Sequence, residues 1–120
     1  MTQRQEKLAN LLKQDIMEIL YREFKDPRLG FVTVINVEVS PDFSYARVFV
    51  SILGNEEEKG RSLAILKRAE HFFRGALSKR LKLRVLPDID FRLDDSVDKG
   101  IRILELLEEI KRNDQSGKPE

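Results

Sequence analysis

The sequence predicts a single α+β domain in which helices cover one face of a three-stranded sheet. Stretches with an apolar residue at every second position alternate along the chain with stretches whose apolar residues recur every three or four positions. Their order is helix, strand, strand, long helix, strand, helix, and a length of 120 residues fits one hydrophobic core. The helix before the third strand is a crossover that permits this strand to pair in parallel with a strand of the preceding hairpin.

The chain opens with a helix and a turn. Thr2 and Gln5 have the spacing of a capping box, and apolar residues at helical spacing predict a helix over residues 3–23. The helix must end before Pro27, because proline donates no backbone hydrogen bond and restricts the residue before it. Asp26 and Arg28 in the following turn have two interpretations, a pair that stabilises the turn or a contact to a binding partner.

Two β-branched stretches follow and predict an antiparallel hairpin. Residues 31–39 predict a strand that is apolar on both faces, and we therefore expect it at the centre of the sheet. One face of this strand is expected to carry Phe31, Thr33, Ile35, Val37 and Val39. Turn residues at 40–44 lead into a second strand, whose buried face is expected to carry Ala46, Val48, Val50 and Ile52.

The second half of the chain predicts a long helix, a third strand and a last helix. Apolar residues from Leu63 to Leu81 recur at helical spacing, Pro87 interrupts the chain, and residues 88–93 alternate as a strand. Asp95 or Ser96 is expected to cap the last helix. The buried stripe of this helix is expected to contain Ile103, Leu104, Leu107 and Ile110. The domain thus spans residues 1–112, and the polar segment 113–120 is predicted to be a disordered tail.

The composition excludes cysteine-dependent sites and argues against a membrane protein. The chain is 41% hydrophobic and 36% charged and contains no cysteine, which excludes disulfides, thiolate metal sites and cysteine nucleophiles. Its longest stretch without a charge covers only residues 29–37, far short of the ~20 apolar residues of a membrane span. The first residues, MTQRQEKL, lack the apolar region of a signal peptide. We therefore expect a cytoplasmic protein that does not bind membranes.

Charge is distributed unevenly along the chain. Residues 1–60 carry a net charge of −2 and residues 85–110 a net charge of −5. Residues 61–84, here called the basic segment, carry eight cations and one acid, for a net charge of +7. These cations are Arg61, Lys67, Arg68, Arg74, Lys79, Arg80, Lys82 and Arg84. The segment predicts a site for a polyanion such as RNA, although its charges could instead pair with the acidic segment that follows.

Catalytic and cofactor motifs are absent from the sequence. His71 is the only histidine, so a catalytic triad or a histidine metal cluster would have to be built around one imidazole inside a basic helix, and we expect His71 to be a partly exposed helix residue or one at a helix irregularity. Spacing of the six glycines excludes a GxxG loop, a P-loop and a Rossmann fingerprint. Phe72 is a candidate for stacking on bases, whereas Phe73 belongs to the core stripe. A magnesium-dependent nuclease would have to use Asp88, Asp90, Asp94 and Asp95, which a solvated strand edge and a helix cap explain more simply.

Three stretches in this order resemble the bacterial ribosome-binding factor A family, over residues 4–110. They are DPRLG followed by VTVINVEVS, then DFSYARV at 42–48, then LPDIDFRLD at 86–94. The resemblance implies a type II KH fold with the order helix, strand, strand, helix, helix, strand. It also implies a non-catalytic assembly factor without cofactors that binds the free 30S subunit, acts on the 5′ region of 16S rRNA during maturation and supports growth in the cold. A ribosome-assembly GTPase would assist its release.

The resemblance also implies a kink between two central helices, at an Ala-x-Gly motif. Ala69, Glu70 and His71 occupy the matching positions, so the glycine is missing here. Histidine enters the left-handed backbone region more often than most non-glycine residues, so the sequence permits a kink here at some conformational cost. Arg74 matches the family's arginine after the kink and is the first candidate for a phosphate contact.

The mechanism predicted from these observations is electrostatic. Cations of the basic segment would contact RNA phosphates, with Arg61 at the margin, while the acidic segment after Val85 would lie away from RNA and aid release. The alternative function is a KH-like module whose basic segment docks an acidic protein partner. In either case we expect a monomer.

Overall fold

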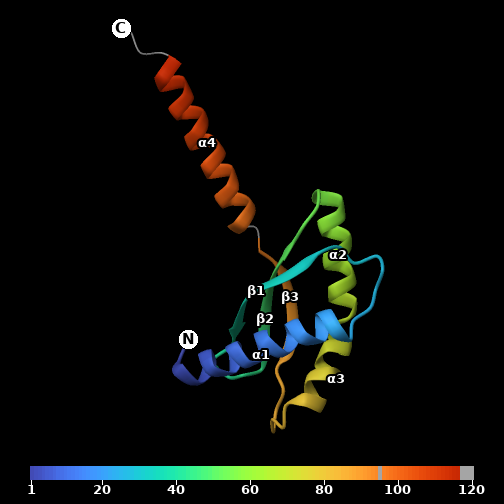
Figure 1. Cartoon of the computed structure of the whole chain (residues 1–120). Coiled ribbons are helices and arrows are strands. Elements are labelled where there is room, and N and C mark those ends of the chain that lie inside the picture. Colours follow the sequence, from blue (N-terminus) through green and yellow to red (C-terminus); the bar gives the residue numbers. More distant parts are fainter. Residues whose placement is uncertain (95, 117–120) are drawn as a thin grey trace.

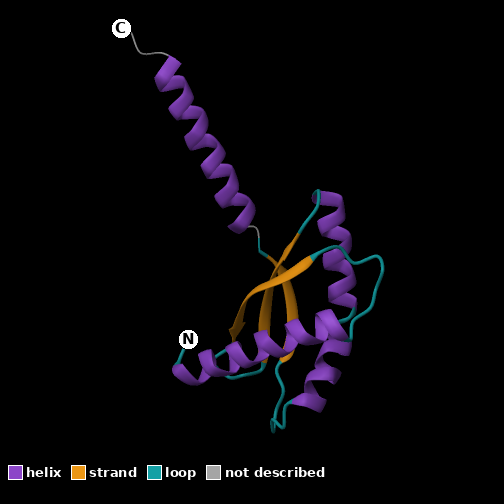
Figure 2. Ribbon diagram, viewed as in Figure 1, coloured by secondary structure: helices purple, strands orange, loops and turns teal. Residues whose placement is uncertain are grey.

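The protein, represented by a computed structural model that describes residues 1–94 and 96–116, contains four helices and three strands over this range. Their order is α1 (Gln3–Arg22), β1 (Val32–Val39), β2 (Tyr45–Ile52), α2 (Glu56–Arg68), α3 (Glu70–Arg80), β3 (Asp88–Leu93) and α4 (Ser96–Ser116). Helices α1, α2 and α3 pack on one face of the sheet, and α4 extends away from it (Figure 1; Figure 2). The α+β class is confirmed, and the long central helix is divided into α2 and α3, as the resemblance implied.

The three strands form one sheet in the order β1-β2-β3. β1 pairs with β2 in antiparallel fashion, and β2 pairs with β3 in parallel, with Val48 beside Phe91. The prediction that β1 is the central strand is therefore wrong. β2 is central because the α2–α3 crossover returns the chain to the free edge of β2, and Ala46, Val48 and Val50 of β2 are accordingly fully buried.

A β-bulge changes which side of β1 faces the core. The register shifts between Val34 and Asn36, so one extra residue is inserted there. As a result Val32 and Val34 are buried together with Val37, although a regular strand would place them on opposite faces. The predicted common face holds only for Val37 and Val39, and Phe31, before the strand, is 67% exposed.

The first helix forms as predicted. The Thr2 hydroxyl accepts a hydrogen bond from the Gln5 N–H, and the Gln5 side chain accepts one from the Thr2 N–H, which completes the capping box. The buried Gln5 amide also donates to the carbonyl of Val39, so it ties the start of α1 to the end of β1. In the turn after α1, Arg28 donates to both carboxylate oxygens of Asp26 and thereby lowers the pKa of that carboxyl.

The last helix does not pack as predicted. The side chains expected to be buried are all more than half exposed: Ile103, Leu104, Leu107 and Ile110. The physical reason is that α1, α2 and α3 already cover the apolar face of the sheet, which leaves no apolar surface for α4. Asp94 accepts a hydrogen bond from the Ser96 N–H at the start of α4, and Asp95 lies outside the described residues. α4 continues to Ser116, four residues into the segment expected to be a tail, whose remainder is also not described.

Candidate nucleic-acid interface

The two central helices meet at a break in the backbone at Ala69. Ala69 has φ −91° and ψ 3°, between the helical and extended regions, and its N–H is shared between the carbonyls of Ile65 and Leu66. His71 lies within the first turn of α3 and is exposed. His71 does not have a positive φ, so the break lies at Ala69 without a left-handed residue at position 71. Bending at Ala69 needs no residue with positive φ, so the missing glycine is not required.

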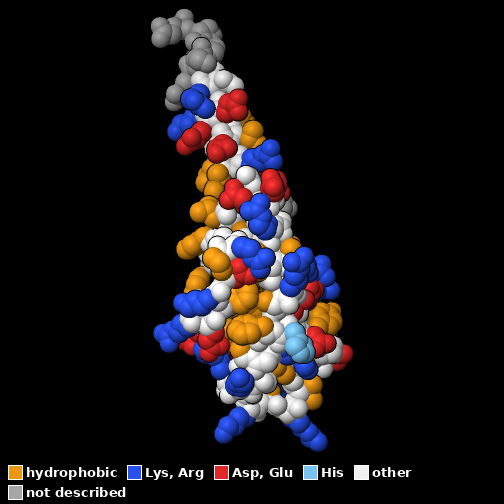
Figure 3. Space-filling model, turned by 90° about the vertical axis from the view of Figure 1, so that its right-hand side faces the viewer, with side chains coloured by type: hydrophobic (Ala, Val, Ile, Leu, Met, Phe, Trp, Pro, Cys, Tyr) orange, Lys and Arg blue, Asp and Glu red, His pale blue; other side chains and the backbone are white. Residues whose placement is uncertain are grey.

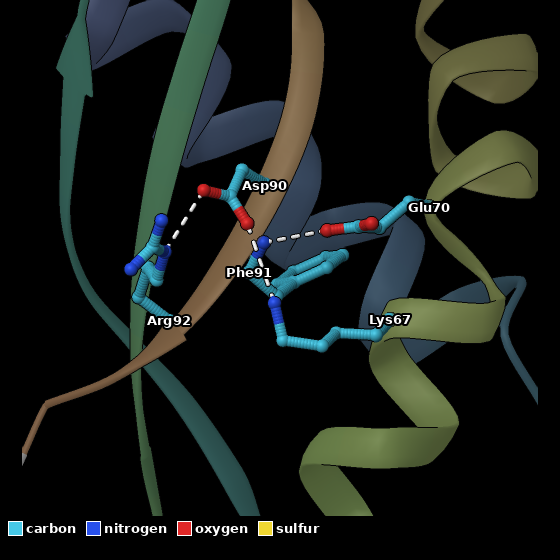
Figure 4. Close-up of polar contacts among 5 residues, drawn as sticks. All are labelled: Lys67, Glu70, Asp90, Phe91 and Arg92. Atoms are coloured by element: carbon cyan, nitrogen blue, oxygen red, sulfur yellow. Dashed lines mark hydrogen bonds and ion pairs between the residues drawn. The ribbon is translucent and has the colours of Figure 1, made fainter.

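A cluster of polar contacts holds this break beside β3 (Figure 4). The Glu70 carboxylate accepts a hydrogen bond of 2.8 Å from the backbone N–H of Phe91, on the outer edge of β3. Lys67 approaches Asp90 to 3.3 Å, and Arg92 donates to the other oxygen of Asp90 at 2.8 Å. Burial alone would raise the pKa of Asp90, but the hydrogen bonds from Arg92 and Lys67 outweigh it and lower this pKa. Glu70, the one acid of the basic segment, thus protects an edge strand.

Four cations of the basic segment are paired with carboxylates. Arg74 contacts Asp88 at 3.2 Å and donates to the carbonyl of Leu86, while Arg61 lies 3.5 Å from Glu57. Lys67 contacts Asp90, as described above. Arg80 is the least exposed of the four, because it lies between α3 and α1.

Arg80 links the two helices through carboxylates. Its guanidinium contacts Glu18 at 2.6 Å and Glu23 at 3.4 Å, and the hydrogen bond that it donates to Glu18 raises the pKa of Arg80 despite partial burial. Because its side chain is only 27% exposed, Arg80 is better placed to hold α3 against α1 than to reach a large ligand.

The other four cations form no ion pair within the described part of the chain: Arg68, Lys79, Lys82 and Arg84. All four are exposed, on α2, on α3 and in the loop that leads to β3. Lys and Arg side chains are prominent on the face formed by α2 and α3, with acidic side chains among them (Figure 3). Asp88 and Asp90 lie beside Arg74 and Lys67, so the acidic segment does not lie apart from the basic one as we expected.

A hollow of about 340 Å³ separates α3 from the loop before β3. His71 and Arg74 line it from α3, and Arg84 lines it from the loop. Phe72, also on α3, is 46% exposed. Its ring centroid lies 5.7 Å from the ring centroids of Phe24 and Phe73. Phe73 is fully buried, as predicted for a core residue.

The acidic side chains near β3 do not form a metal site. Among the side chains that the structure describes, no three acidic or histidine residues come close enough together to hold a metal ion. Asp88 and Asp90 instead face cations. Over the same residues, none of the helices has the length and apolar character needed to cross a bilayer.

Comparison with known proteins identifies the family. A family model described as ribosome-binding factor A matches residues 4–107. The chain belongs to the ribosome-binding factor A family. It is 40% identical to ribosome-binding factor A of Desulforamulus reducens, over 99% of this chain and 98% of the relative. It is 45% identical to that of Dictyoglomus thermophilum, over 96% and 97% of the two chains.

Solved structures of ribosome-binding factor A have the same fold. A putative ribosome-binding factor A of Thermotoga maritima has a TM-score of 0.68 at 42% identity, covering 75% of this chain and 86% of its own. The crystal structure of the Thermus thermophilus protein has a TM-score of 0.65 at 34% identity, covering 74% and 93%. A homology model of the Thermus protein, fitted into a cryo-electron-microscopy map of a 30S complex, has a TM-score of 0.57 at 30% identity and covers 80% and 97%.

Proposed function

We propose that this chain binds the free small ribosomal subunit and the 5′ region of its 16S rRNA during late maturation, as a non-catalytic assembly factor. The observation that carries the proposal is the set of exposed cations without ion pairs, Arg68, Lys79, Lys82 and Arg84. Such cations displace counterions from RNA phosphates without first breaking a bond within the protein. Membership of a family with a relative fitted into a map of a 30S complex supports the small subunit as the source of this RNA.

The remaining cations of the basic segment would act in a second way. For Lys67 and Arg74, a phosphate competes with the carboxylates of Asp90 and Asp88. Their contribution to affinity is therefore smaller than that of an unpaired cation, because the lost ion pair offsets part of the gain. Arg61 contributes at the margin, and Arg80 holds α3 in position. The factor acts as a monomer on the subunit, supports growth in the cold, and leaves with the assistance of a ribosome-assembly GTPase.

Sedimentation tests the proposal directly. Tagged protein is expected to cosediment with free small subunits and to be depleted from complete ribosomes. The triple variant Arg68→Gln/Lys79→Gln/Lys82→Gln should lose most of this association and lower the slope of affinity against salt, on logarithmic axes, by about 2. A matched control neutralises three cations of α4, Arg102, Lys111 and Arg112, and should behave as the wild type.

Two outcomes would contradict the proposal. Undiminished cosedimentation of the triple variant would show that these cations do not bind the subunit. Association with a partner that survives RNase treatment would instead favour the alternative function, in which the basic segment docks an acidic protein.

A further inference from the structure

A second concave surface lies between the start of α1 and the loop before β3, and we call it the α1 groove. It has a volume of about 550 Å³. Its apolar lining residues are Leu8, Leu11, Phe43, Leu83 and Val85. Its remaining lining residues are three cations, Arg4, Lys7 and Arg84, and no acidic side chain lines it. The groove therefore suits a ligand that combines an apolar body with negative charge.

Leu8 and Phe43 of the groove also pack against the hydrophobic core, whereas the other three apolar side chains that line it are exposed. Leu11 is 42% exposed, Leu83 39% and Val85 68%, so adjacent apolar groups face solvent. Arg4, Lys7 and Arg84 form no ion pair with any described residue, unlike the cations that face Asp88 and Asp90. Leu11, Leu83 and Val85 thus form the solvent-facing apolar part of the groove, beside three cations that have no ion pair within this part of the chain.

Backbone strain is concentrated at one residue of the groove. Phe43 has φ +61°, the only positive φ of a non-glycine residue within the described chain, and this conformation is unfavourable for a bulky side chain. The surrounding turn holds it there, because the Asp42 carboxylate accepts hydrogen bonds from Ser40 and from both the N–H and the hydroxyl of Ser44. The hydrogen bonds from Ser44 and Ser40 also lower the pKa of Asp42. The turn therefore keeps an aromatic ring at the groove.

We propose that the α1 groove binds one unpaired base of a single-stranded RNA segment, with Arg4, Lys7 and Arg84 on the flanking phosphates. Apolar and aromatic side chains hold unstacked bases in many RNA-binding proteins, and nearby cations follow the backbone. The proposal rests on the proposed function and extends it. Arg84 lines both this groove and the hollow beside Arg74, so a strand bound at the basic segment can continue into the groove. This continuity favours RNA over an acidic amphipathic protein segment, the other ligand with suitable chemistry.

Fluorescence of 2-aminopurine tests base insertion in the full chain. The probe is a single-stranded oligoribonucleotide with one 2-aminopurine, compared with a blunt RNA duplex of equal length. Wild type should change the emission of the single strand and not that of the duplex. Val85→Ser should abolish this change and weaken single-strand binding at least about fivefold, with duplex binding unaffected. Leu53→Ser is the matched control, because Leu53 is 75% exposed and lies outside the groove.

The outcomes separate the groove from the proposed function. If Val85→Ser and Leu53→Ser bind the single strand equally well, the groove holds no base, whereas retained cosedimentation with small subunits leaves the proposed function standing. If Val85→Ser weakens cosedimentation with subunits and leaves binding to protein-free 16S rRNA intact, the groove holds a protein segment and the inference is overturned. If wild type binds neither RNA nor subunits, both proposals fail.

Discussion

The cations of the basic segment fall into two groups, one that faces carboxylates and one that does not. Lys67, Arg74 and Arg80 lie opposite carboxylates of β3 and α1, whereas Lys79 and Lys82 point to solvent without an ion pair among the described residues. Both groups are equally basic in sequence. The paired group links α2 and α3 to β3 and α1, and under the proposed function the unpaired group is the one available to a polyanion. A dense run of charge therefore overstates the charge that is available for binding.

The largest expected difference in RNA affinity is between a variant that neutralises two unpaired cations and a variant that neutralises two paired ones. Lys79→Gln/Lys82→Gln should weaken binding to 16S rRNA roughly tenfold at 0.1 M salt and lower the logarithmic salt slope by about 1.5. Lys67→Gln/Arg74→Gln should have less than half of this effect on the slope, because each lost cation also frees a carboxylate. Filter binding across a salt series measures both quantities. Equal slopes for the two double variants would contradict the distinction.

Removing the acid of the basic segment should affect stability and not binding. Glu70→Ala leaves the N–H of Phe91 without its acceptor, which should lower the free energy of unfolding by about 1 to 2 kcal/mol. Urea denaturation followed by circular dichroism measures this. Glu57→Ala is the control, because the Glu57 side chain is 83% exposed and its removal should cost less than ~0.5 kcal/mol. An equally small loss for both variants would mean that the Glu70 bond does not stabilise β3.

Removing the carboxylates that face Lys67 and Arg74 should leave these two cations without an ion pair. Asp88→Asn/Asp90→Asn frees Arg74 and Lys67, and RNA affinity should rise roughly threefold through long-range attraction and new phosphate contacts. Occupancy on mature subunits should rise as well. Glu105→Gln/Glu108→Gln on α4 makes the same change in net charge and serves as control. A rise of equal size in the control would show that only net charge matters.

The smallest expected effect is in the pH dependence of stability. Because the pKa of Asp90 is lower in the folded chain than its ordinary value of about 3.9, its ionised form stabilises the fold above that pH. This contribution is lost as the pH falls below about 4 and through the folded-state pKa. Asp90→Asn should therefore flatten the acid limb of stability, measured by thermal denaturation from pH 3 to 7. An unchanged acid limb would show that the pair with Lys67 and Arg92 contributes nothing.

Some elements could be predicted from the sequence because they depend on neighbouring residues. The Thr2 and Gln5 capping box, the hairpin and β3 were predicted correctly, since caps, turns and alternation act over a few positions. The position of β2 at the centre of the sheet, and the bulge near Ile35, were not. Strand order depends on where the crossover returns, and a bulge depends on the partner strand, so neither leaves a clear local signal.

The candidate site, like the fold, could be predicted from the sequence only in part. The concentration of cations between residues 61 and 84 was visible in the sequence, but Arg4, Lys7 and Phe43 of the groove were not connected to it. They come from α1 and from the β1–β2 turn, and only packing brings them beside Arg84. The sequence placed Phe43 in the turn between the two strands, but nothing in the local pattern indicates that this turn lies beside Arg84.

The amino-acid order alone determined the type and sequence of the elements, the chemistry of the basic segment and the family. Tertiary structure decided which apolar faces are covered, since α4 and α1 are both amphipathic and only α1 meets the sheet. It also decided which charges are neutralised. The reason is the distance along the chain over which each interaction acts. Helical and strand periodicity depends on residues that are close in sequence, whereas burial and ion pairing depend on surfaces that come together from distant positions.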